Sequence, residues 1–167
     1  LTLTADTTFE NVNIGAVKNG TPVKYTITGK DGVGISRCDT GLLTSITGYI
    51  LSLMGNVNAD KIKATGNLSL YGDIKAIGGI TAKDVCIYGN TNLVMNQDSK
   101  FTISGGVVDF NGEVIKITIL DKKTGEPASL NEGYVIGSVK DTTSENIVLN
   151  AEAHPNLKIE NVNGKLI

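Results

Sequence analysis

A stretch in the middle of this chain repeats itself with a period of 17 residues. Residues 51–56 read LSLMGN, and 17 residues later residues 68–73 read LSLYGD. A third copy opens at residues 85–90 with VCIYGN. Within each period an aliphatic residue recurs, a small or aliphatic residue follows two positions later, and Gly with Asn, Asp or Gly usually comes next. A fixed period of this kind limits the chain to folds that stack one small unit on the next.

The spacing inside each copy predicts short strands joined by tight corners. The first and third residues of a strand face the same side, so each piece has one buried side, and Gly followed by Asn or Asp suits a corner. Three strands and three corners close one coil, on which the next copy stacks in parallel. We therefore predict an all-β fold, a single-stranded parallel β-helix (β-solenoid) with about 17 residues per coil in its central part. Leu53, Leu70 and Ile87 should form one buried column, and Ala59 and Ala76 a second.

Other folds explain the pattern less well. A helix is disfavoured because each interior Gly costs roughly 1 kcal/mol and the apolar spacing follows no helical face. A two-sheet sandwich also suits short alternating strands, but it gives no reason for the same motif to return after 17 residues. Aromatic residues make up only 5% of the chain and Trp is absent, so the core must consist of Ile, Leu, Val and Ala.

The repeat divides the chain into three parts. Residues 48–112 are the predicted regular β-solenoid, and residues 1–47 are irregular N-terminal β coils that act as a cap. Residues 113–167 are a C-terminal β cap or a small antiparallel element, because a stack of coils must cover its last apolar layer.

The charged residues give no support for catalysis or metal binding. Lyases with β-helical folds need clustered acids for calcium and a basic residue that accepts a proton. The acids on the coils are spaced by 13, 11 and 14 residues instead of 17, and so should be spread around the coils: Asp60, Asp73, Asp84 and Asp98. His154, the only histidine, precedes Pro155 in a polar segment and predicts an exposed turn. We expect no catalytic residue, no metal site and no cofactor.

Cysteine content, charge and hydropathy argue against further classes of site and partner. Cys38 and Cys86 are the only cysteines, 48 residues apart and without a C-x-x-C pair, which favours two free thiols over a zinc site or a disulfide. A formal net charge of −2 gives no basic surface for nucleic acid. The longest apolar run, residues 49–54, is far shorter than the ~20 residues of a membrane span.

Two tyrosines are the candidate ligand-binding residues. Tyr71 and Tyr88 hold the fourth position of successive copies, where Met54 stands one coil earlier. Fourth positions alternate to the outside, so the rings should lie one above the other at about the 4.8 Å strand spacing. An outward aromatic ladder predicts a platform for polysaccharide. The alternative is that the terminal strands cover these residues as a second core.

The repeats resemble two groups of proteins. Residues 55–59 and 72–76 resemble the repeating unit of bactofilins, although bactofilins have more uniform coils and little of the long tail after residue 113. The whole layout resembles β-helical modules of adhesin-like bacterial surface proteins, as in Gram-positive gut bacteria. That resemblance implies a noncatalytic extracellular module, located at the cell surface, that displays neighbouring domains of the same precursor and binds polysaccharide or a host surface ligand.

Two other functions stay open at this point. One is a bactofilin-like, self-polymerising cytoskeletal protein, and the other is a β-helical carbohydrate-active enzyme. The chain opens with Leu1 instead of Met, so we expect it to be a piece of a longer precursor. A signal peptide and wall-anchor or repeat domains in that precursor would favour the surface module.

Overall fold

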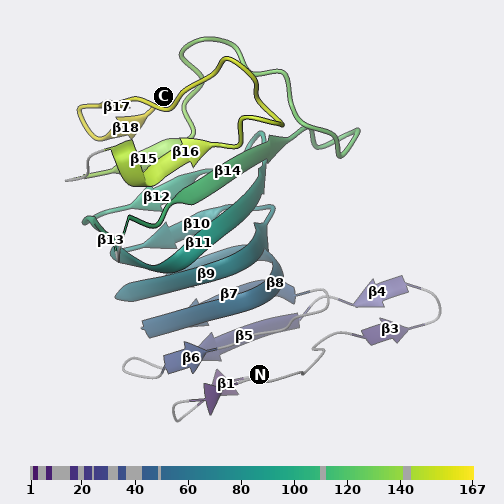
Figure 1. The fold of residues 1–167 in the computed structure, drawn as a ribbon. Coiled ribbons are helices and arrows are strands. Elements are labelled where there is room, and N and C mark those ends of the chain that lie inside the picture. Colours follow the sequence, from purple (N-terminus) through teal and green to yellow (C-terminus); the bar gives the residue numbers. More distant parts are fainter. Residues whose placement is uncertain are drawn as a thin grey trace.

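A computed structural model describes residues 2–3, 7–8, 16–18, 21–23, 25–29, 34–36, 43–48, 50–109, 112–140 and 144–167. Within these ranges the fold is all-β, with one 3-10 turn at Ser144–Asn146 and no α-helix. Sixteen of the described strands form one mostly parallel, curled sheet, and β3 and β4 form a separate antiparallel hairpin. The strands lie across the molecule in successive layers from the N-terminal to the C-terminal end (Figure 1).

In chain order, the strands are β1 (Thr2–Leu3), β2 (Thr7–Thr8), β3 (Ala16–Lys18), β4 (Thr21–Val23), β5 (Tyr25–Gly29), β6 (Gly34–Ser36), β7 (Leu43–Gly48), β8 (Ile50–Ala64), β9 (Asn67–Ala76), β10 (Ile80–Ala82), β11 (Asp84–Asn96), β12 (Phe101–Ile103), β13 (Val107–Asp109), β14 (Ile115–Leu120), β15 (Gly137–Val139), β16 (Ile147–Leu149), β17 (Asn161–Val162) and β18 (Lys165–Leu166).

The 17-residue period of the sequence is the offset between β8 and β9 and between β9 and the first part of β11. β8 and β9 pair in parallel from Leu51 opposite Leu68 onward, and β9 and β11 keep the same offset through Leu70 opposite Ile87. Leu53 lies opposite Leu70, and all three members of that predicted column have 0% exposure. The first predicted column is therefore confirmed.

The second predicted column is confirmed as well. Ala59 lies opposite Ala76 in the pairing of β8 with β9, and both side chains are buried. Because the strands are parallel and in register, equivalent residues of successive copies come to the same height and the same side of the sheet.

Strand β8 has four neighbours, which shows how sharply the sheet turns. Residues 50–52 pair with β6, residues 51–59 with β9, residues 59–64 with β7 and residues 62–63 with β10, all in parallel. A strand has only two edges, so the sheet must curl along β8 to give it these neighbours. The all-β class and the parallel pairing agree with the sequence prediction, whereas closure into a single-stranded β-helix stays a prediction.

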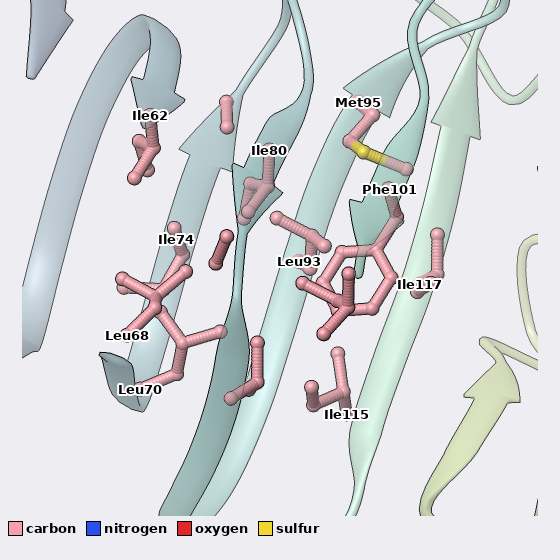
Figure 2. Close-up of a cluster of buried hydrophobic side chains, with 14 of the residues drawn as sticks. Ile62, Leu68, Leu70, Ile74, Ile80, Leu93, Met95, Phe101, Ile115 and Ile117 are labelled. Atoms are coloured by element: carbon pink, nitrogen blue, oxygen red, sulfur yellow. The ribbon is translucent and has the colours of Figure 1, made fainter. Parts of the chain in front are cut away.

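The core lies on the inner side of the curled sheet. Figure 2 shows Leu93 of β11 and Ile117 of β14 beside the Phe101 ring, with Leu70 of β9 farther along the same core. Alternate residues of β14 are buried, the pattern of strands with one face in the core. Burying an aliphatic side chain of this size contributes about 1.5–3 kcal/mol, so the stacked columns supply much of the stability.

The predicted Gly-Asp corner is present in β9. Gly72 has a φ of 91°, in the left-handed region that favours glycine, and it separates the inward Leu70 from the inward Ile74. The chain turns here without breaking the ladder, since Gly72 and Asp73 remain paired with both neighbouring strands.

The pairing changes direction at the C-terminal end. β16 pairs in parallel with β14, and β15 in parallel with β12, but β18 runs antiparallel to both β15 and β17. A small antiparallel element is thus present within residues 113–167. β11 pairs with β14 across the predicted boundary at residue 112, and the division into 1–47, 48–112 and 113–167 stays a prediction.

The turn predicted at His154 is present, but the predicted exposure of the histidine is wrong. His154 is only 2% exposed, and its Nε2 accepts a hydrogen bond from the backbone N–H of Ile119 at 3.0 Å. The segment folds back onto β14 because the N–H of Asn150 donates to the carbonyl of Ile117 at 2.8 Å. Burial lowers the pKa of His154 below its usual value, which suits a neutral imidazole acting as acceptor.

Candidate functional site

A surface groove lies at the Gly72 corner of β9 and the neighbouring part of β11, where the register between the two strands shifts. Its walls are residues 71–73 of β9, residues 88–90 and Asn92 of β11, and Glu113 ahead of β14. The groove has a volume of about 760 Å³. Both predicted ligand-binding residues, Tyr71 and Tyr88, therefore line one hollow, which we call the tyrosine groove.

The two tyrosines face solvent. Tyr71 is 50% exposed and Tyr88 is 54% exposed, whereas the neighbouring Leu70 and Ile87 are fully buried. This is the outward orientation expected from the alternation along each strand. The alternative, in which the terminal strands cover both rings as a second core, is wrong for this structure.

The predicted ladder of directly opposed rings needs a correction. Leu70 lies opposite Ile87, but the next pair along β9 and β11 is Gly72 with Thr91. Tyr71 therefore faces three residues of β11, residues 88–90, instead of Tyr88 alone. The physical reason is a bulge, which inserts two extra residues into β11 and shifts its register against β9 by two residues, so that Ile87 and Leu93 both stay in the core.

The bulge gives the Tyr71 ring a support. A Cβ atom added at Gly89 would overlap Cδ2 and Cε2 of Tyr71, so the ring lies directly against the Gly89 backbone. Gly89 is itself buried. Packing on one side holds the ring in place and leaves about half of the side chain open to solvent, which lowers the entropy lost when a ligand stacks on it.

Polar groups surround the rings. Nδ2 of Asn92 donates to Oδ1 of Asp73 at 2.8 Å, which ties β9 to β11 across the groove. Oδ1 of Asn90 accepts the backbone N–H of Val114 at 3.3 Å and connects the bulge to the chain that enters β14. The groove thus combines two aromatic rings with amides and carboxylates, a mixture that suits a ligand with apolar faces and many hydroxyl groups.

Sequence reasoning found the tyrosines but missed the polar walls. The spacing of the acids places Asp73 only among charges spread around the coils, although it follows Gly72 at the same place where Asn90 follows Gly89. That shared position was a signal that both side chains lie near the rings. Asn92 and Glu113 reach the groove only because of the bulge and of the chain path into β14, for which the repeat gave no signal.

The other candidate residues lie away from this groove. Asp84 accepts the backbone N–H of Gly106 at 3.2 Å, as suits a corner residue. Cys86 is a free thiol whose pKa is raised by burial and then by the nearby Asp84 carboxylate. Cys38 lies outside the described residues, so the prediction that both thiols are free stays open.

A second hollow lies at the C-terminal end of the sheet. Its volume is about 590 Å³, and its walls include Ile136, Leu149, Leu157 and Tyr134. The Lys100 ammonium lies 4.8 Å from the centre of the Tyr134 ring, a cation–π contact at this end of the molecule. Neither residue was singled out from the sequence.

Neither a metal centre nor a membrane-spanning helix is found among the described residues. Within those ranges, no group of three or more His, Cys, Asp or Glu side chains is arranged to hold a metal ion. None of the described residues belongs to a helix with the length and apolarity needed to span a bilayer. Comparison of the chain with protein-family models, with curated proteins and with solved structures finds no match.

Proposed function

We propose that this chain is a noncatalytic β-solenoid module of a longer bacterial surface protein, that it displays neighbouring domains outside the cell, and that it binds polysaccharide in the tyrosine groove. The observation that carries the binding role is the presence of Tyr71 and Tyr88, both half exposed, in one groove of about 760 Å³. The surface location rests on the resemblance of the repeat layout to adhesin-like modules.

The parallel pairing supports the solenoid part of the proposal. A coil that closes after three strands places the same residue one layer higher after each turn, and the 17-residue offset between β8 and β9 fits that geometry. The four neighbours of β8 fit a strand that runs through successive faces of one coil. A stack of this kind is a stiff spacer, because each layer is hydrogen bonded to the next along its whole length.

Exposure of the rings supports the binding part. Among the described residues, the exposed large hydrophobic side chains are Tyr71, Tyr88, Leu157 and Val162, and the two aromatic ones lie in the same groove. Exposed aromatic side chains that gather at one place mark interaction sites more often than scattered ones do. A pyranose ring presents C–H groups on its faces and hydroxyls on its rim, which match aromatic faces and amide or carboxylate walls respectively.

The test replaces both rings and measures binding and folding separately. The Tyr71→Ala/Tyr88→Ala variant should lose about 1–3 kcal/mol of binding to a retained polysaccharide, or roughly 5- to 150-fold in affinity. Its melting temperature should stay close to that of the parent, because the rings are half exposed and leave no internal cavity. Affinity gel electrophoresis against a panel of plant, microbial and host polysaccharides gives the first quantity, and calorimetry gives the second.

The matched control removes the other exposed apolar side chains. Leu157→Ala/Val162→Ala takes away two exposed side chains near the C-terminal end and should leave retention unchanged. Equal retention of the parent and the tyrosine variant would refute the binding role. Release of sugars or unsaturated products by the parent would favour the carbohydrate-active enzyme, and ordered filaments of the isolated chain would favour the bactofilin-like polymer.

A further inference from the structure

We propose that the tyrosine groove selects uncharged polysaccharides and discriminates against those whose sugars carry carboxylates. The selection rests on the proposed function, since it concerns which glycan the same groove accepts. It follows from the charges on the groove walls and from the chemistry of the two rings.

The charged side chains among the described residues of the groove wall are both acidic. They are Asp73 from β9 and Glu113 ahead of β14. The hydrogen-bond donor to Asp73 is the amide of Asn92, which is neutral and leaves the negative charge in place. A uronate bound between these walls would bring a third carboxylate next to Asp73, with no gain of an opposite charge from the wall.

The two tyrosine rings, like the wall carboxylates, disfavour an anionic ligand. The face of a tyrosine ring carries a partial negative charge, so it attracts the C–H groups of a sugar face and repels an anion. The Tyr71 ring is held against Gly89, so it has little freedom to turn its positive edge toward a carboxylate. The best ligand for the groove is therefore a neutral hexose or pentose polymer that stacks on the rings and donates hydroxyl protons to the carboxylates.

Two nearby lysines need their own controls. Lys116 of β14 lies directly opposite the groove residue Asn92, and the exposed Lys75 follows Asp73 by two residues on the same face of β9, so both lysines border the groove. Lys116 is exposed as well, and neither lysine is part of the groove wall. Either lysine would attract an anionic polymer at the edge of the groove, and Lys75→Gln and Lys116→Gln separate that attraction from binding at the rings.

The experiment compares polymers that share a backbone and differ in charge. Affinity electrophoresis at low salt uses hydroxyethyl cellulose against carboxymethyl cellulose, and galactan against polygalacturonate. The repulsion between two carboxylates about 5 Å apart in water corresponds to about fourfold in affinity, which is the preference expected from Asp73 alone. We expect the parent chain to prefer the neutral member of the pair that it binds by about this factor.

Neutralising the wall is the decisive variant. Asp73→Asn/Glu113→Gln keeps an oxygen acceptor for sugar hydroxyls at each position but removes both charges, so retention on the neutral polymer should fall modestly, retention on the charged partner should rise, and the preference should shrink severalfold. High salt should shrink the preference of the parent in the same way, because salt screens exposed charges.

The outcomes separate this inference from the proposed function. If no polysaccharide of either charge is retained, the binding role itself fails. If charged and neutral polymers are retained equally by the parent and by the two lysine variants, and both are lost in the tyrosine variant, the groove binds glycans but the charge selection is wrong. An unchanged preference in the neutralised variant would also overturn the selection, since the wall acids would then not be its source.

Discussion

The buried histidine offers the sharpest test of how the C-terminal region is held. Nε2 of His154 accepts the N–H of Ile119, a core strand residue of β14. In His154→Ala that donor loses its partner inside the protein, which costs about 1–3 kcal/mol, and removal of the 2%-exposed ring adds a cavity. For a chain of this size each kcal/mol shifts the melting temperature by roughly 2–4 °C, so we expect a fall of roughly 4–10 °C.

The same hydrogen bond makes stability depend on pH. Burial lowers the pKa of His154 in the folded state, whereas in the unfolded chain it titrates near its ordinary value of about 6.5. Above that pH both states are neutral, and the contribution of the imidazole is complete. As the pH falls below it, the unfolded chain takes up a proton that the folded chain does not, so stability decreases.

His154→Gln is the matched variant, because its amide oxygen can accept a hydrogen bond but does not titrate in this range. The stability of the parent relative to His154→Gln should be greatest near pH 8 and should shrink toward pH 5. Differential scanning calorimetry or urea unfolding at several pH values measures this difference. A difference that stays constant over this range would refute the assignment of the buried neutral imidazole.

Three further predictions concern the core and the cysteines. Leu70→Ala, which opens a cavity between Leu53 and Ile87, should destabilise the fold by about 2–5 kcal/mol in urea unfolding, and a loss under 1 kcal/mol would contradict the stacked column. Cys86 should react more slowly with iodoacetamide near pH 8 in the folded chain than in the chain unfolded by urea. The reason is that burial, and then the Asp84 carboxylate, raise its pKa. Equally rapid labelling of the folded chain would contradict a buried Cys86 thiol beside Asp84. Intact mass under nonreducing conditions should show two free thiols, and a loss of two hydrogens would reveal a disulfide with Cys38.

The repeat made the central ladders predictable because the rules that govern them are local. Alternation along a strand places Leu70 inward and Tyr71 outward whatever the rest of the chain does. The Gly72-Asp73 corner needs only a backbone that tolerates positive φ, and Gly72 has it. Stacking then follows from the period, since only a 17-residue offset brings like residues opposite one another in β8 and β9.

The tyrosine groove was predictable only in part. The outward direction of both rings follows from local alternation, but the position of one ring relative to the other depends on the bulge in β11. Whether extra residues near Gly89 are absorbed as a bulge or as a longer corner depends on which register keeps Leu93 in the core on the far side. The choice between a bulge and a longer corner depends on packing against strands distant in sequence, which the pattern of one repeat does not contain.

The sequence by itself determined the strand period, the buried columns and the outward tyrosines, because each depends on spacing within a few residues. Only the tertiary structure decided that Asp73 and Asn92 meet across two strands, that Glu113 joins them, and that His154 is buried against β14. These contacts join residues 19 to 40 or more positions apart, and chain connectivity does not fix which polar side chains meet at such separations. Their burial and hydrogen bonding depend on how the irregular segments pack onto the regular ladders, which no local pattern encodes.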